Sequence, residues 1–408
     1  MTSYLELFAS GTILVLIQAL AALPWLYVID PAAFKAAARQ WNVIGGCIAG
    51  VLVAGAIFGW MIGIYNEPTK LADYGWWYGM VLHLQLAVDS VIAALGLLVL
   101  VWPRVGTIAQ ATFREGYRQP MFWLLIGAVI LLMFFSTFLP YYTFGDDYKM
   151  MKQLGFDMIM LSTMLFCVLL ASMSVSEEIE GRTAVTLMSK PVTRRQFLLG
   201  KFFGILLAGW FMTMLLAGVF NLALWLQTYW GEKLANDIGD QMTSEVQTAV
   251  GPAVQSLGFG QIGKTVFKGV GAWEGETLAN LLGLAMGFGL VMVMLAIAVS
   301  LATRVTMVVN LVICLVMFLL GNLSPVLVQA AQQLQGGASA LVTFLAKLFD
   351  MLLPSLQYAS TNQVYIRETP LGAAEYAVYV GSVMGYFTLY SAIALLAGLL
   401  LFEDRDSA

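Results

Sequence analysis

Long runs of apolar residues dominate this chain and leave it few ways to fold. Several of them reach the roughly 20 residues that a helix needs to cross a hydrocarbon layer about 30 Å thick. Hydrophobic residues make up 60% of the 408 positions and charged residues only 11%, so a single soluble core could not bury the apolar surface. Strands of a membrane barrel would instead be short and would alternate in polarity. The sequence therefore predicts an all-α integral membrane protein.

The apolar runs predict about nine transmembrane helices. Glu6 is the only charged residue between Met1 and Gly11, and without a basic leader segment a cleavable signal peptide is disfavoured. We therefore expect the first helix to be retained. An odd number of spans places the two termini on opposite sides of the membrane. The predicted spans cover residues 6–28, 42–65, 77–102, 120–141, 155–176, 194–228, 276–302, 305–323 and 376–402.

The basic residues decide which terminus lies inside. Lys and Arg are enriched in cytoplasmic segments of membrane proteins. With the amino terminus outside, the inside segments hold 12 of the 20 Lys and Arg residues. We therefore expect a multi-pass protein of the cell membrane (inner or plasma membrane), with its amino terminus outside and its carboxyl terminus in the cytoplasm. The inside residues are Lys35, Arg39, Arg104, Arg114, Arg118, Arg182, Lys190, Arg194, Arg195, Lys201, Arg304 and Arg405.

Two further segments have helical periodicity without the length of a span. The first precedes the fourth span and suits a helix lying in the inner membrane interface. The second, residues 339–352, precedes the last span and suits an amphipathic helix in the outer leaflet. Their apolar positions are Val105, Ile108, Ala109, Thr112 and Phe113 in the first and Leu341, Phe344, Leu345, Leu348, Phe349 and Leu352 in the second.

A charged loop over residues 176–201 separates the fifth and sixth spans. Gly181 can end the fifth span in a left-handed conformation, and Thr183 can cap a short helix over residues 184–189 that Pro191 then ends. The order Thr193-Arg194-Arg195-Gln196 fits a capping box at the start of the sixth span. Both ends of the short helix would then be held by transmembrane helices, so a push on it would reach them.

The loop offers a contact surface that has an apolar centre and a charged rim. Charges at the rim of such a surface orient a partner more than they increase its affinity. A simpler alternative is a solvated cytoplasmic loop whose basic residues follow the positive-inside rule. The specific order of residues favours a docking surface. Its candidate residues are Glu177, Glu178, Glu180, Gly181, Arg182, Thr183, Leu187, Met188, Lys190, Pro191, Arg194 and Arg195.

The loop reads E-E-I-E-G-R-T from Glu177, L-M-S-K-P-V-T-R-R-Q-F from Leu187, and G-K at Gly200 and Lys201. In residue types and order it resembles the loop by which membrane subunits of the ABC type-2 transporter family engage separate ATPase subunits. The resemblance implies that Glu178, Glu180 and Arg182 contact the ATPase and that residues 184–189 form the coupling helix.

The resemblance also implies an architecture. Members of that family have an interfacial helix, six spans, a coupling helix and a short outer helix before the last span, and residues 105–402 look the same. Residues 1–104 would then form an additional three-helix membrane region, and residues 403–408 a cytoplasmic tail. By resemblance, the chain would be the permease subunit of an ATP-driven exporter, paired with a second copy as a homodimer.

The expected partners follow from that resemblance. They are a cytosolic ABC ATPase, the second permease copy and membrane lipids, whereas no basic patch for nucleic acid is found. ATP and Mg would be bound by the ATPase, so that we expect no cofactor, metal or catalytic residue in this chain. Residues 258–265 do spell the phosphate-binding pattern G-x-x-x-x-G-K-T. No clear strand precedes them, however, so a flexible glycine-rich loop is the favoured interpretation.

Asp89, inside the third span, is the intramembrane polar candidate, with Gln85 one turn before it and His83 nearby. An acidic residue within a span is a candidate for a proton or ion relay, although a neutral or hydrogen-bonded Asp at a helix contact is the favoured interpretation. The first interpretation would suit an ion-coupled secondary transporter. A third possibility is a membrane anchor that binds an ATPase without moving a substrate.

The core spans contain amides but almost no charge, which is consistent with a hydrophobic or amphiphilic substrate. The alternative is that the amides only join neighbouring helices. These residues are Asn280, Asn310 and Asn322.

Overall fold

The computed structural model describes residues 2–64, 67–138, 147–180, 193–231, 241–333, 344, 355–359 and 372–403. Apart from a short 3-10 turn, these residues form α-helices joined by brief connections, and none of them forms a strand. The helices are α1 (Thr2–Ile29), α2 (Pro31–Ala37), α3 (Trp41–Ile64), α4 (Pro68–Val101), α5 (Pro103–Arg118), α6 (Pro120–Phe138), α7 (Asp147–Glu180), α9 (Arg194–Gly231), α10 (Gln241–Gln255), α11 (Gly260–Leu301), α12 (Met307–Gln333), the turn η2 (Leu356–Ala359) and α15 (Ala373–Glu403).

Proline marks the start of several helices. Pro31, Pro68, Pro103 and Pro120 are the first residues of α2, α4, α5 and α6. Proline suits this position because its fixed φ is helical and the missing N–H would have no partner in the first turn. At α2 the side chain of Asp30 completes the start by accepting hydrogen bonds from the N–H groups of the second and third helical residues, at 3.0 and 2.9 Å.

The prediction of an all-α membrane protein is confirmed. Eight helices in the described part of the chain are long and apolar enough to span a membrane, and they correspond to the predicted spans except that of residues 305–323. The predicted span over residues 305–323 corresponds to the apolar part of α12, Met307–Leu323, which is shorter than the eight spanning helices. The predicted outer helix over residues 339–352 lies outside the described residues except for Phe344, which is helical.

The prediction of a flexible loop at residues 258–265 is wrong, because α11 begins at Gly260 and continues unbroken to Leu301. Gly260 has a φ of +65°, a conformation that glycine adopts without strain. Ser10 of α1 holds the start of α11 by exchanging hydrogen bonds of 3.2 Å with both the N–H and the carbonyl of Phe259. Sequence alone missed these contacts because Ser10 and Phe259 are far apart along the chain.

The chain forms two compact units. The first consists of Met1–Ala94 and Ala217–Leu281, and the second of Leu95–Leu216 and Leu282–Ala408. The long helices α4, α9 and α11 each contribute one part to each unit. The predicted division of the chain at residue 104 remains a prediction, because each compact unit combines two separate segments of the chain.

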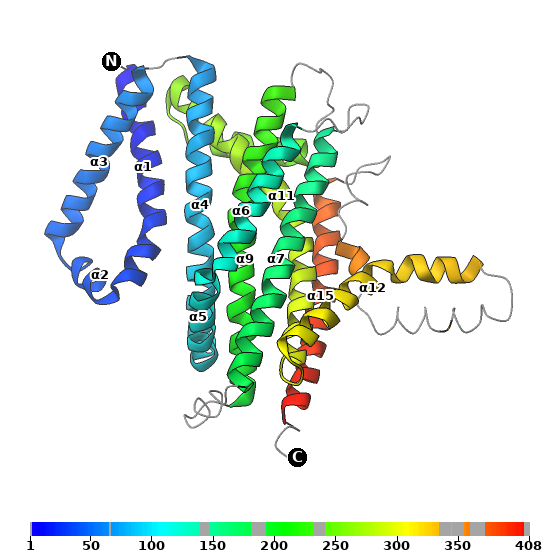
Figure 1. Cartoon of the computed structure of the whole chain (residues 1–408). Coiled ribbons are helices and arrows are strands. Elements are labelled where there is room, and N and C mark those ends of the chain that lie inside the picture. The colour runs from blue at the N-terminus through cyan, green and yellow to red at the C-terminus, as the bar shows by residue number, and fades with distance from the viewer. Residues whose placement is uncertain are drawn as a thin grey trace. The chain divides into compact units, whose positions relative to one another are not determined.

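Small residues bring the helices of the first unit together. α1 and α3 lie side by side and are joined by α2 (Figure 1). Gly11 of α1 meets the backbone of Gly55 and Gly59 of α3, where an added Cβ would clash. Gly75 of α4 and Gly269 of α11 each meet the backbone of the other helix in the same way. Membrane helices associate closely at such positions because only small residues let two backbones approach.

The second unit is a bundle in which α7 packs against α6 and α12. Buried polar bonds join its helices. The amide of Asn310 on α12 donates to the hydroxyl of Ser172 on α7 at 2.9 Å and to the carbonyl of Ala298 on α11 at 3.0 Å. The hydroxyl of Ser300 on α11 donates to the carbonyl of Ala394 on α15 at 2.7 Å. Bonds of this kind stabilise a membrane bundle by roughly 0.5–2 kcal/mol each.

We expect Gly75→Leu to destabilise the first unit, because the new side chain would collide with the backbone of α11 at Val266. Overpacking typically costs about 1–3 kcal/mol. Gly96→Leu is the matched control, since Gly96 lies on the same helix with nothing within 4 Å of an added Cβ. The melting temperature of the purified protein in detergent measures both. An equal decrease for the two variants would contradict the close crossing of α4 and α11.

Candidate functional site

The predicted docking loop is only partly described. Glu177, Glu178 and Glu180 fall in the last turns of α7, and Arg194 and Arg195 open α9. The remaining candidates lie outside the described residues, namely Gly181, Arg182, Thr183, Leu187, Met188, Lys190 and Pro191. The expected coupling helix over residues 184–189 therefore stays a prediction. What the structure describes is the set of helices to which the loop is attached.

The predicted capping box at the start of α9 is confirmed. The N–H of Gln196 donates to the hydroxyl of Thr193 at 3.3 Å, and the N–H of Thr193 donates to the side-chain oxygen of Gln196 at 3.1 Å. These reciprocal bonds satisfy two backbone donors at a helix start, where no carbonyl of the preceding turn is available. The loop therefore enters α9 at a defined residue.

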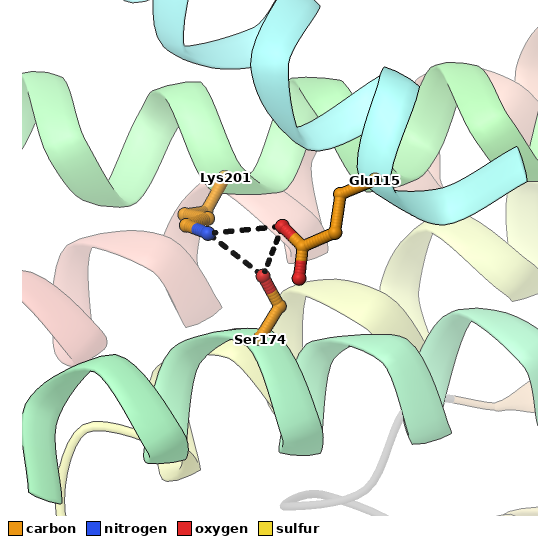
Figure 2. A network of polar contacts seen from close by, with 3 residues as sticks. All are labelled: Glu115, Ser174 and Lys201. Carbon is orange, nitrogen blue, oxygen red and sulfur yellow. Dashed lines mark hydrogen bonds and ion pairs between the residues drawn. The ribbon is translucent and has the colours of Figure 1, made fainter. Parts of the chain in front are cut away.

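A buried lysine joins three helices beside the loop (Figure 2). Lys201 of α9 is only 4% exposed, and its Nζ donates to the hydroxyl of Ser174 on α7 at 2.7 Å. The same Nζ lies 3.6 Å from Oε2 of Glu115 on α5. Ser174 in turn donates to this carboxylate oxygen at 3.2 Å. We call these three residues the Lys201 cluster.

Close helix packing makes the Lys201 cluster possible. Gly200 and Gly204 of α9 lie against α5, where an added Cβ would collide with Ile108, Ala109 or Thr112. The buried residues of α5 recur at helical spacing and so form one face of the helix. They are Val105, Gly106, Ala109, Thr112 and Gly116. A charged lysine is buried without a large penalty only when it is paired and hydrogen-bonded. Glu115 and Ser174 supply that pairing.

Sequence reasoning included Lys201 in the loop motif but missed its partners. The amphipathic helix predicted before the fourth span is confirmed as α5, and three of its five predicted apolar positions are buried. The two glycines spaced four apart on α9 were the available signal for a close helix contact. Nothing in the spacing along the chain connects Glu115 with Ser174, because they lie 59 residues apart.

Two arginines hold the carboxyl end of α15. Nη1 of Arg194 donates to the carbonyl of Phe402 at 3.1 Å, and its guanidinium lies 5.5 Å from the centre of the Phe402 ring. Nε of Arg304 donates to the carbonyl of Leu401 at 2.7 Å. The last carbonyls of a helix lack partners and carry partial negative charge, so cations stabilise this end. Arg194 therefore has a structural contact, and its predicted contact with an ATPase stays a prediction.

Asp89 lies half-buried on α4, where the side chain of Trp25 on α1 hydrogen-bonds its carboxyl group, while its Oδ1 has no partner among the described residues. Its neighbour Gln85 is bonded instead to the side chain of Gln18 on α1. His83 packs its ring 6.0 Å from that of Trp273 on α11. Neither residue is thus shown to assist Asp89. Its proposed role in a proton or ion relay stays a prediction.

A second polar network lies in the first unit, between α9, α10 and α11. The amide of Asn280 donates to the side-chain oxygens of Asn221 and Glu276 at 2.8 and 3.2 Å. Asn221 donates to the hydroxyl of Thr277 at 2.8 Å, and Gln247 to the other oxygen of Glu276 at 3.4 Å. A predicted span with almost no charge therefore contains a hydrogen-bonded carboxylate, which sequence reasoning passed over.

The three predicted amides have different partners. Asn280 and Asn310 bond neighbouring helices, as the alternative interpretation of these residues requires. Asn322 donates to the carbonyl of Phe318 on its own helix at 2.9 Å. Their presence therefore needs no substrate to explain it, and the hydrophobic or amphiphilic character of the substrate stays a prediction.

We expect the removal of Glu115 and the removal of Lys201 to lower the free energy of unfolding by different amounts. Glu115→Leu removes the carboxylate facing a buried cation and should lower the free energy of unfolding by about 1–3 kcal/mol. Lys201→Met removes the buried charge itself, so it should cost less, and the double variant should be more stable than Glu115→Leu alone. Melting temperatures of the four proteins measure this cycle, with Arg114→Leu on the same helix as control. If Lys201→Met failed to improve the Glu115→Leu protein, the two charges would not be coupled.

Comparison with known protein families places this site in context. Residues 117–249 match the model of the family described as ABC-2 family transporter protein. The match includes all of the charged loop over residues 176–201 and Ser174 and Lys201 of the cluster. A comparison with curated protein sequences found no match. The resemblance drawn from the loop is thereby confirmed for this part of the chain: residues 117–249 of this multi-pass membrane protein form a domain of the ABC-2 transporter family.

Proposed function

We propose that this chain is the permease subunit of an ATP-driven exporter and works with a separate cytosolic ATPase. The observation that carries the proposal is the family match, which covers the charged loop whose residue order resembles an ATPase-docking loop. ATP and Mg would be bound by the partner, so the role of this chain is to convert a change in the partner into a movement of helices. The export direction follows from the resemblance alone.

The helices beside the loop support this transmission. The capping box fixes where the loop enters α9, and the Lys201 cluster ties α9 to α7 and α5. The loop leaves α7 and returns into α9, so both of its ends lead into the joined set. A displacement of the loop would therefore shift these helices together as a packed body. Movement of packed bodies against one another is a common form of switching between two access states.

A second copy of the chain is part of the proposal. Two permeases would enclose the pathway between them, and each would present one charged loop to one ATPase. We expect the substrate to be hydrophobic or amphiphilic, because the predicted core spans contain amides but almost no charge. Transport measurements with substrates of different polarity test this expectation.

The proposed docking function is tested by co-purification. The tagged chain is isolated from its own cells with its associated proteins, as wild type and as the Glu178→Lys, Arg182→Glu double variant. The variant exchanges two charges without changing the net charge. We expect an ABC ATPase to be recovered with the wild type and at least tenfold less of it with the variant, because reversed charges oppose complementary charges on the partner.

The matched control is Lys264→Glu combined with Glu375→Lys. Both residues are exposed and belong to segments that we expect on the outer side of the membrane, away from a cytosolic ATPase. This protein should retain the ATPase in full. Equal recovery with all three proteins, each shown to reach the membrane, would refute docking through the charged loop. Retention of an ATPase by a chain that moves no substrate in any flux assay would favour the anchor alternative.

A further inference from the structure

A pocket lies between the start of α5 and the start of α9 in the second unit. Its volume is about 400 Å³, and it is open on one side. It is lined by Trp102, Pro103, Arg104 and Val105 around the start of α5 and by Arg195, Gln196 and Leu199 in the first turns of α9. The α9 wall belongs to the charged loop of residues 176–201 and includes the docking candidate Arg195, whereas none of the α5 residues of the wall does. The α5 side of the pocket is therefore the part that the proposed docking function does not use.

The pocket combines positive charge with unused hydrogen-bond donors. Arg104 is exposed, and none of the lining residues is acidic. Trp102 is the N-cap of α5 and its side chain makes no capping bond. The N–H groups of Arg104 and Val105, in the first turn, are thus not satisfied by a side-chain cap. Arg195 adds a second positive charge, although it also interacts elsewhere in the chain.

The remaining walls are apolar. Trp102, Pro103, Val105 and Leu199 supply them, and Trp102 is 52% exposed. Trp102 of the pocket wall comes directly after Val101, the last residue of an apolar helix that is long enough to span a membrane. Tryptophan at such a position is typical of the boundary between hydrocarbon and headgroups. The pocket therefore lies at the depth of lipid headgroups, whichever side of the membrane this is.

We propose that this pocket binds the phosphate group of an anionic phospholipid. The Arg104 guanidinium and the first-turn N–H groups of α5 would hold the phosphate, and the apolar walls would contact the upper part of the acyl chains. Basic pockets between membrane helices are suited to such headgroups. A soluble anion would gain nothing from the apolar walls. A protein partner would have to reach past the lipid headgroups to contact them.

The test uses the purified full-length protein in a neutral detergent, without any ATPase. Native mass spectrometry compares bound phosphatidylglycerol with bound phosphatidylcholine of the same acyl chains. We expect the wild type to prefer the anionic lipid. Arg104→Gln should reduce this preference about fivefold, which corresponds to the loss of roughly one kcal/mol for one basic residue near the membrane surface. Arg114→Gln is the matched control, being the same change at an exposed position of the same helix outside the pocket.

Two additional ligands separate the sources of the phosphate. Glycerol phosphate and inorganic phosphate carry the anion without acyl chains, and each should compete at least tenfold more weakly than the phospholipid. The proposal is overturned if Arg104→Gln keeps the wild-type lipid preference or if Arg114→Gln loses it to the same extent. If inorganic phosphate competed as strongly as the phospholipid, the pocket would bind a free anion and the proposed lipid site would be overturned. If Arg104→Gln instead reduced ATPase recovery while lipid binding stayed unchanged, the pocket would be a protein contact.

Discussion

The absence of water in a lipid hydrocarbon layer constrains every part of this protein. A backbone that crosses such a layer must satisfy its own N–H and carbonyl groups, which a helix does within a single segment. Apolar side chains gain little by leaving lipid for one another, so helices must associate through close packing and buried polar bonds. The glycines of α1, α3, α4 and α11 and the amide of Asn310 perform these two tasks.

The Lys201 cluster follows from the same constraint. A lysine at 4% exposure would be costly without partners, and it is tolerated because a carboxylate and a hydroxyl meet it at one point. These partners come from α5 and α7, so the charge can be buried only while the three helices stay together. The interaction therefore makes the packing of α5, α7 and α9 specific. It also connects both ends of the charged loop to α5.

The two ends of α9 illustrate how one helix serves different purposes. Its first residues form a capping box, bond the end of α15 through Arg194 and line the pocket beside α5. Its later residues belong to the first unit, where Asn221 joins the network with Asn280 and Thr277. In both places a polar side chain is satisfied by a neighbouring helix. This is what is expected of polar groups in a segment that crosses a membrane.

The amino-acid sequence by itself determined the fold class, the approximate positions of the spans and the start of α9. These features depend on short-range properties, namely runs of apolar residues, proline at helix starts and the spacing of Thr193 and Gln196. The order of charges in the loop also led to the ABC-2 transporter family, over the part of the chain that the family match covers. Sequence failed at residues 258–265, where glycines indicated a loop and the structure has the start of α11.

Only the tertiary structure decided which distant residues meet. Glu115, Ser174 and Lys201 come from three helices, and Ser10 contacts Phe259 across 249 residues of sequence. The pocket is likewise formed from the start of α5 and the start of α9. Helix periodicity tells which face of a helix is apolar, but it does not tell which helix covers that face. That choice depends on the fit of small residues and polar pairs between helices, which exists only once the chain has folded.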